Sequence, residues 1–389
     1  MREGGKFPLA SVLGVLFCAV AVMGATGINA VLLPVRLQEM GYSKGAIGIC
    51  MAAEVAAVVI VSPFVARIVS TLGLTFTFLL AAFVRFLCLG FMMEFPSYYS
   101  WVPAVFAYGL ASNIFIAAVM TWLSELPLGR FTGLCTGLFS SALSLGTAAG
   151  PLALSFAGFE GHAPFQANMI VVGLAVIPVV LLLAKIPKIA PSPKPRILFI
   201  TRLSPAVVAS AFVGGITFTG LPAFLTLYGI QNNYEPQAAA WLLTAFMLGS
   251  VTLSPVVGVV SDYVDRRLVI LSCFALGMVA AIYLPLAIVS YKVTLVLLYL
   301  WGGSAGGIFA VGIAFLNERF RPEDHISVGV TYTLMDCLGG MIGVFLIGYA
   351  MDFDRDGLTY VISAAAILYF IFALTRYRRT PERREGRKL

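Results

Sequence analysis

The chain has 389 residues, of which 60% are apolar and 11% are charged, and its mean hydropathy is +0.96. A water-soluble domain of this length needs a larger charged surface, so the composition excludes a soluble globular protein. Apolar runs of roughly 20 residues recur along the chain, and each is long enough to cross a hydrocarbon core of about 30 Å. The sequence therefore predicts an all-α membrane protein.

Twelve apolar runs are expected to be transmembrane helices. The first is too long for the core of a signal peptide, which makes it a retained span. An even number of spans places both termini on the same side of the membrane. The predicted spans cover residues 8–36, 44–70, 73–93, 99–124, 131–156, 166–186, 205–230, 236–261, 267–290, 293–317, 327–350 and 357–376.

The formal net charge is +7, and the basic residues are distributed unevenly between the two sides of the membrane. With both termini assigned to the cytoplasm, twenty basic residues fall on the cytoplasmic side and four on the opposite side, which is the positive-inside pattern. The basic tail from Arg376 is thus expected to need no nucleic-acid partner and to contact anionic membrane lipid. The expected location is the cytoplasmic (inner) membrane of a bacterium, with the N and C termini in the cytoplasm.

A Pro-rich basic stretch, PKIAPSPKPRILFITRL, follows the sixth span and divides the chain. A gapless shift of the second half onto the first superposes Ser62-Pro63 on Ser254-Pro255. Two similar rigid bundles are suited to open a central cavity to each side in turn, as secondary transporters do. The predicted organisation is an N-terminal six-helix bundle (1–186), a cytoplasmic linker (187–203), a C-terminal six-helix bundle (204–376) and a basic cytoplasmic tail (377–389).

The loop after the eighth span reads Gly258-Val-Val-Ser-Asp262-Tyr-Val-Asp265-Arg266-Arg267. It resembles the signature G-x-x-x-D-[RK]-x-G-[RK]-[RK] of the major facilitator superfamily. This resemblance implies the twelve-span fold of that family and a conformational gate, in which Asp262 pairs with arginines or with a helix N-terminus in one state and is released in the other. An ordinary positive-inside loop is the alternative interpretation.

In this family the signature is most typical of the loop between spans two and three. There the chain has Ala66, Ser70 and Leu74 at the aligned positions, so the first-half copy has decayed. Arg130, at the start of the fifth span, also resembles the family's cytoplasmic loop between spans four and five, and it is a further gate candidate.

The fifth span carries Gly137, Gly146 and Gly150-Pro151. This spacing resembles the element G-x8-G-x3-G-P-x2-G-G of the proton-antiporter branch of the family, with the last Gly pair replaced by Leu154-Ser155. Small residues and a helix-bending Pro at an interface between the halves allow close packing. A purely structural role and an antiport marker therefore both fit this span.

Three ionisable residues, Glu54, Arg85 and Asp336, lie near the middle of predicted spans, where a charge is costly unless it is paired or solvated. An apolar environment favours the protonated form of a carboxylate, which makes Glu54 and Asp336 the proton-coupling candidates. Arg85 is a candidate for holding an anionic substrate group. The alternative is a static pair between Arg85 and one of the carboxylates.

The resemblance implies that spans one, four, seven and ten line the substrate cavity. For any single polar residue of these spans, a helix-helix hydrogen bond or an interfacial anchor is the competing interpretation. With Arg85, the substrate-cavity candidates are Asn29, Asn113, Thr219, Tyr228 and Trp301.

The leading hypothesis is a proton-coupled secondary transporter for a small organic solute, with no cofactor, no metal site and a monomeric state taken from the family. Primary pumping is disfavoured because the sequence contains no G-x4-G-K-[ST] phosphate loop. Proton-coupled efflux of amphipathic or drug-like compounds and symport uptake of a nutrient both remain open. A membrane-embedded enzyme with catalytic residues, or a receptor that binds without transport, are the other classes considered.

Overall fold

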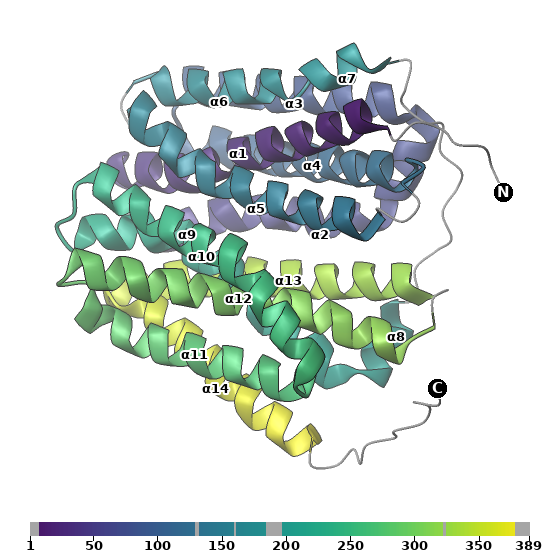
Figure 1. Ribbon diagram of the computed structural model, residues 1–389. Coiled ribbons are helices and arrows are strands. Elements are labelled where there is room, and N and C mark those ends of the chain that lie inside the picture. Colours follow the sequence, from purple (N-terminus) through teal and green to yellow (C-terminus); the bar gives the residue numbers. More distant parts are fainter. Residues whose placement is uncertain (1–7, 129–131, 159–160, 184–196, 322–323, 378–389) are drawn as a thin grey trace.

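The computed structural model describes residues 8–128, 132–158, 161–183, 197–321 and 324–377, which fold into α-helices joined by short loops (Figure 1). In chain order the helices are α1 (Leu9–Glu39), α2 (Lys44–Leu72), α3 (Leu74–Glu94), α4 (Tyr98–Ser124), α5 (Thr132–Ala157), α6 (Ala163–Leu174), α7 (Ile177–Leu181), α8 (Ile197–Leu203), α9 (Pro205–Gln231), α10 (Pro236–Tyr263), α11 (Arg266–Ala287), α12 (Tyr291–Arg319), α13 (His325–Phe353) and α14 (Gly357–Tyr377).

The helices have the length and composition of membrane spans. Within the described residues, 11 are long and apolar enough to cross a membrane, and α5 contributes a shorter apolar stretch, Ser141–Leu154. Large apolar side chains cover much of the outer surface, as expected where lipid takes the place of water. The prediction of an all-helical membrane protein is confirmed.

The sixth predicted span is not one continuous helix. It is divided into α6 and α7 by a turn at 175–176, where Pro178 occupies the first turn of α7. Proline lacks the N–H that would continue the α6 hydrogen-bond ladder, so the interruption falls just before it. The last seven residues of the predicted linker form the short helix α8, whereas residues 184–196 lie outside the described part of the chain.

The second half of the chain repeats the helix pairing of the first. In the first half α1 packs on α5, α2 on α4 and α3 on α6. In the second half the corresponding pairs are α9 with α13, α10 with α12 and α11 with α14. The two groups of helices lie side by side in Figure 1 and meet through α2 with α13 and α5 with α10, which are again equivalent positions. This pairing is a structural repeat that the weak sequence repeat only suggests.

Glycines bring the paired helices into backbone contact. A Cβ atom added to Gly150 of α5 would lie 2.5 Å from the amide nitrogen of Ile28 and 2.6 Å from the carbonyl oxygen of Gly24, both in α1. In the second half, a Cβ on Gly339 of α13 would meet the carbonyl oxygen of Phe212 in α9. Helices in lipid associate through such close packing because apolar surface alone gives them no preference for one another over lipid.

We expect Gly150→Ala to destabilise the protein by about 1–3 kcal/mol, because the added methyl group has only rigid backbone to push against. Gly173→Ala is the matched control, since a Cβ at this exposed α6 glycine has nothing within 4 Å. The measurement is thermal unfolding of the detergent-purified variants. Equal melting temperatures for the two variants would contradict the packing described for α1 and α5.

Candidate functional site

The first half of the molecule encloses a positive charge. Arg85 of α3 is fully buried, and its Nη2 donates to the hydroxyl of Tyr108 at 2.5 Å and to the carbonyl oxygen of Val22 at 3.3 Å. Its guanidinium carbon lies 4.6 Å from the centre of the Tyr108 ring, a cation–π contact. Its Nε and Nη1 have no hydrogen-bond partner among the described residues. The site thus holds a cation with unused donors.

Two buried amides connect α1 and α6 in the same half. Nδ2 of Asn168 donates to Oδ1 of Asn29 at 2.7 Å, and both side chains are completely shielded from solvent. Nδ2 of Asn29 and Oδ1 of Asn168 have no partner within the described part of the chain. Unsatisfied buried amide atoms are costly, so this pair has spare capacity to bind a polar ligand or water. Sequence reasoning selected Asn29 and missed Asn168, which is the sole asparagine of its span.

Glu54 lies beside this polar centre but is not paired with Arg85. It packs on Gly109 of α4, where an added Cβ would be 2.8 Å from Glu54 Cγ, and the preceding residue is Tyr108. No hydrogen bond or ion pair joins the Glu54 carboxylate to another described residue. The static Glu54–Arg85 ion pair that the sequence left open is therefore not formed in this structure.

Asp336 of α13 lies in the second half, beside a cavity of about 10 Å³, which is near the smallest volume that holds a water molecule. Its walls include Tyr332, whose hydroxyl donates to the carbonyl oxygen of Ile308 at 3.1 Å and lies 3.2 Å from the hydroxyl of Ser210. No cation pairs with Asp336 among the described residues. Its backbone carbonyl contacts Gly215 of α9, so the residue is held where two helices touch.

The two carboxylates are on helices that pack together across the two halves. Near its start α2 contacts the end of α13, because Gly48 packs on Val344 and Gly348. The helices are antiparallel, so this register places Asp336 roughly 3–9 Å further along the shared axis than Glu54, at about 1.5 Å per residue. The helices α2 and α13 therefore meet across the halves, but Glu54 packs on α4 in the first half and Asp336 lines a cavity with α9 and α12 in the second.

The remaining substrate-cavity candidates differ in their surroundings. Thr219 of α9 contacts α13 at Gly340, one turn beyond Asp336. The hydroxyl of Tyr228 donates to Oδ1 of Asp356 at 2.7 Å, which uses it to hold the loop between α13 and α14. Trp301 is buried against Phe246 in the second half, edge to face. Asn113 is half-buried in α4.

A clasp formed by Lys44, Gly45 and Asp352 joins the halves at the end of the molecule opposite the first turn of α1. The amide nitrogens of Lys44 and Gly45, at the start of α2, donate to the two carboxylate oxygens of Asp352 at 2.6 and 2.8 Å. The Lys44 ammonium also donates to the carbonyl oxygen of Met351 at 2.7 Å. A carboxylate at a helix N-terminus is favoured by the helix dipole, so the clasp is a charge-assisted contact between α2 and α13.

The loop between α10 and α11 holds a small ion-pair network. Nη2 of Arg266 lies 3.0 Å from Oδ1 of Asp262 and 2.8 Å from Oε1 of Glu318 in α12, and Asp265 caps α11 through the amide nitrogen of Arg267. The sequence missed Glu318 because the pairing follows from the packing of α11 on α12. The gate candidate Gly258 has open space where a Cβ would be, and Arg130 lies outside the described residues.

The glycine motif of the fifth span lies in α5. Gly146 and Gly150 contact the backbone of α1, within the first half, and an added Cβ on Gly146 would meet the carbonyl oxygen of Val20. Pro151 is buried inside the helix. For Gly137 the structure describes only its place in α5. Gly146 and Gly150 therefore serve packing inside one half, although α5 itself also contacts α10 of the other half.

The fold and the polar interior define a class of protein, a polytopic membrane transporter with paired halves. The sequence profile of the Major Facilitator Superfamily matches residues 15–235 and 207–389, and the chain belongs to this superfamily of secondary transporters. It is not an enzyme. Its substrate is a small molecule that it moves through the membrane in which it is embedded.

Two bacterial transporters resemble the chain in sequence, one over most of its length and one over part of it, and a solved transporter structure resembles it in fold. The uncharacterised MFS-type transporter YfkF of Bacillus subtilis (strain 168) is 22% identical over 361 residues, covering 89% of this chain and 91% of YfkF. The multidrug transporter MdtP of the same organism is 28% identical over 158 residues, covering 39% of this chain and 28% of MdtP. The crystal structure of the nucleoside transporter NupG matches with a TM-score of 0.76 at 12% identity, over 95% of this chain and all of that one, and the structure of a NupG mutant gives 0.77.

We expect Tyr108→Phe to destabilise the protein by roughly 1.5–3 kcal/mol, because it removes the shorter of the two hydrogen bonds that the buried Arg85 guanidinium donates. Tyr99→Phe is the matched control, since Tyr99 lies at the start of the same helix, α4, but its side chain is 85% exposed. Thermal unfolding in detergent measures both variants. A Tyr108→Phe protein as stable as the control would show that Arg85 does not depend on this bond.

Proposed function

We propose that the chain exports a small amphipathic solute across the bacterial inner membrane in exchange for protons, by alternating access. The observation that carries this proposal is the pair of carboxylates, Glu54 and Asp336, neither of which forms an ion pair with another described residue, on helices that pack across the two halves. A carboxylate in such surroundings gains or loses a proton when its access to water changes. Proton binding is thereby linked to the movement of the halves.

Export is favoured by two observations. The glycine-proline element of α5 resembles that of proton antiporters, and the relative MdtP is a multidrug transporter. Uptake by proton symport is the second candidate, because Leu154-Ser155 replaces the last Gly pair of the antiporter element. The two candidates share the same coupling residues and differ in the direction in which solute and proton move relative to each other.

The substrate is proposed to bind between the halves, near the spare donors and acceptors of Arg85, Asn29 and Asn168 and near Thr219. The first half supplies polar contacts and the second half supplies mainly apolar walls around Asp336. Such a division suits a compound with one polar end and an apolar body. Monomers suffice for this mechanism, because each chain contains both halves.

The membrane orientation is proposed from the charge distribution. Both α8 and the end of α14 carry arginines and lie at the same end of the molecule as the start of α1 (Figure 1). The positive-inside rule assigns this end to the cytoplasm. The clasp of Lys44, Gly45 and Asp352 then closes the outer side, so that the outer path opens when the clasp is released.

We expect Glu54→Gln and Asp336→Asn each to abolish the pH dependence of ligand binding. The parent is screened against amphipathic cations and nucleosides by thermal shift in detergent at about pH 6 and about pH 8, because deprotonated carboxylates and protonated ones favour different states of the carrier. Ligands found in this way are then tested for flux in proteoliposomes with an imposed pH gradient. Glu94→Gln, at the exposed end of α3, is the matched control.

Each result of this experiment has a defined meaning. Loss of pH dependence in both site variants, with retention in the control, supports proton coupling by these residues. A ligand that binds with the same pH dependence in all four proteins contradicts it. Solute that accumulates inside the vesicles when protons flow in indicates symport. Solute that accumulates when protons flow out indicates antiport.

We expect Asp352→Ala to raise the labelling of Cys50 by a membrane-impermeant thiol reagent in intact cells, in a background where Cys50 is the sole cysteine. Cys50 is fully buried, just past the clasp in α2. Asp354→Ala is the matched control, because its carboxylate bonds within its own loop. Labelling that rises in inverted vesicles but not in intact cells would contradict the orientation, and no rise in either would contradict the role of the clasp.

A further inference from the structure

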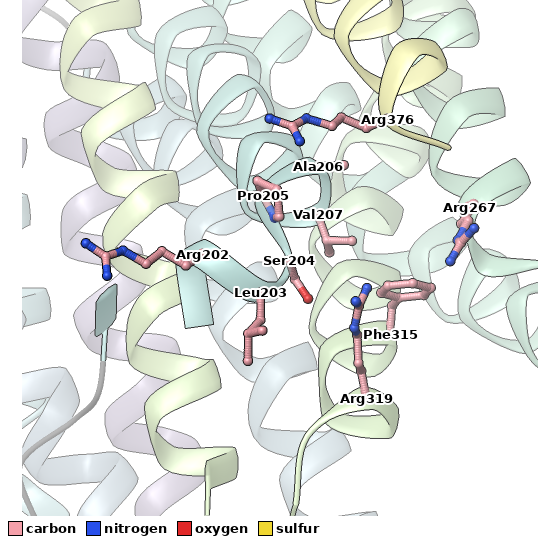
Figure 2. A pocket seen from close by; sticks show the side chains of 10 residues that line it. All are labelled: Arg202, Leu203, Ser204, Pro205, Ala206, Val207, Arg267, Phe315, Arg319 and Arg376. Carbon is pink, nitrogen blue, oxygen red and sulfur yellow. The ribbon is translucent and has the colours of Figure 1, made fainter. Parts of the chain in front are cut away.

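A cavity of about 220 Å³ lies at the beginning of α9, in the second half and away from the carboxylates (Figure 2). We call it the arginine pocket. Its walls come from α8, α9, α11, α12 and α14, and its lining residues are Arg202, Leu203, Ser204, Pro205, Ala206, Val207, Arg267, Phe315, Arg319 and Arg376. Four of these are arginines and none of these described residues is acidic.

The four arginines lie at different places around the pocket. Figure 2 shows the guanidinium group of Arg319 pointing toward the hydroxyl of Ser204, whereas that of Arg202 points outward at the rim. The guanidinium carbon of Arg267 lies 5.8 Å from the centre of the Phe315 ring, and both residues line the pocket. The nearby carboxylate of Glu318 is engaged by Arg266. The described lining of the pocket thus carries basic side chains and no carboxylate.

The start of α9 adds neutral donors to these charges. Ser204 is the N-cap residue of α9, but its side chain makes no capping bond, and its buried hydroxyl has no partner among the described residues. After Pro205, which has no N–H, Ala206 and Val207 are in the first turn, where backbone N–H groups lack intrahelical acceptors and point along the helix axis. A hydroxyl, helix N–H groups and guanidinium forks are the donors that bind phosphate groups in proteins.

The surroundings of the pocket connect it to the membrane surface. The short helix α8 exposes Leu198 and Phe199, and its last residue, Leu203, is 46% exposed while it lines the pocket. Apolar side chains of such a helix insert at the boundary between lipid headgroups and acyl chains. A ligand in the pocket therefore has its phosphate beside the arginines and has apolar surface within reach.

We infer that the arginine pocket binds a phosphate group, carried by an anionic phospholipid or by a soluble phosphate. The guanidinium of Arg319, the hydroxyl of Ser204 and the first N–H groups of α9 hold the phosphate oxygens. The site is independent of the transport path described above. A phospholipid bound there fixes α8, and with it the end of the segment between the two halves, to the membrane surface.

The test is a titration of the detergent-purified full chain, followed by its melting temperature. One arm adds short-chain phosphatidylglycerol, with phosphatidylcholine of equal chain length as its control. The other arm adds inorganic phosphate, with sodium chloride at equal ionic strength as its control. Arg319→Gln is compared with Arg67→Gln, which removes an exposed arginine from α2 in the other half.

We expect a saturable rise in melting temperature with phosphatidylglycerol. The half-saturating concentration should be about tenfold higher in Arg319→Gln, because this variant loses one charged contact to the phosphate. Arg319→Lys keeps the positive charge but loses the forked guanidinium group, so its half-saturating concentration should fall between those of the parent and Arg319→Gln. A response to phosphatidylglycerol alone identifies a lipid headgroup site, and an equal response to inorganic phosphate identifies a soluble anion site. Responses that are the same in the parent, Arg319→Gln and Arg67→Gln overturn the proposal.

Discussion

Direct contact between helix backbones, which glycine permits because it lacks a Cβ atom, is the interaction on which both halves of this transporter depend. The same contacts position the ionisable residues of the interior. Glu54 packs on Gly109, and the carbonyl oxygen of Asp336 packs on Gly215. Each carboxylate therefore lies where two helices are closest, and a small change in helix packing alters its surroundings at once. In a bilayer, where apolar surface gives no preference for one helix partner, this packing also selects the fold.

The two halves share helix pairing but differ in chemistry. The first half contains a buried cation with unused donors and two amides with unused capacity, whereas the second contains an unpaired carboxylate beside a cavity of about 10 Å³, as far as the described residues show. A repeat with identical interiors would bind solute and proton in the same way in each half. In the mechanism that we propose, the polar groups around Arg85 bind the solute, Glu54 and Asp336 bind protons, and the common helix pairing lets the halves move as similar bodies.

The ends of the molecule also differ. At one end, the start of α2 is bonded to Asp352 of α13 by charge-assisted contacts that span the halves. At the other end, the ion pairs of Asp262, Arg266 and Glu318 lie within the second half, and the arginine pocket belongs to that half as well. The clasp thus joins the two halves at one end, while the described ion pairs and the arginine pocket at the other end lie within one half.

Hydropathy, charge asymmetry and the Asp262 loop signature are local properties of the chain. From them the amino-acid sequence alone predicts a membrane protein, its number of spans to within one, its family and the charged residues that lie in its spans. Tertiary structure decided which groups meet. Asn168 and Glu318 were missed, the Glu54–Arg85 pair did not form, and Tyr228 proved to hold a loop, since each of these outcomes depends on helices that are distant in sequence. Partner choice depends on helix rotation and register, which glycine contacts fix, and no local pattern encodes them.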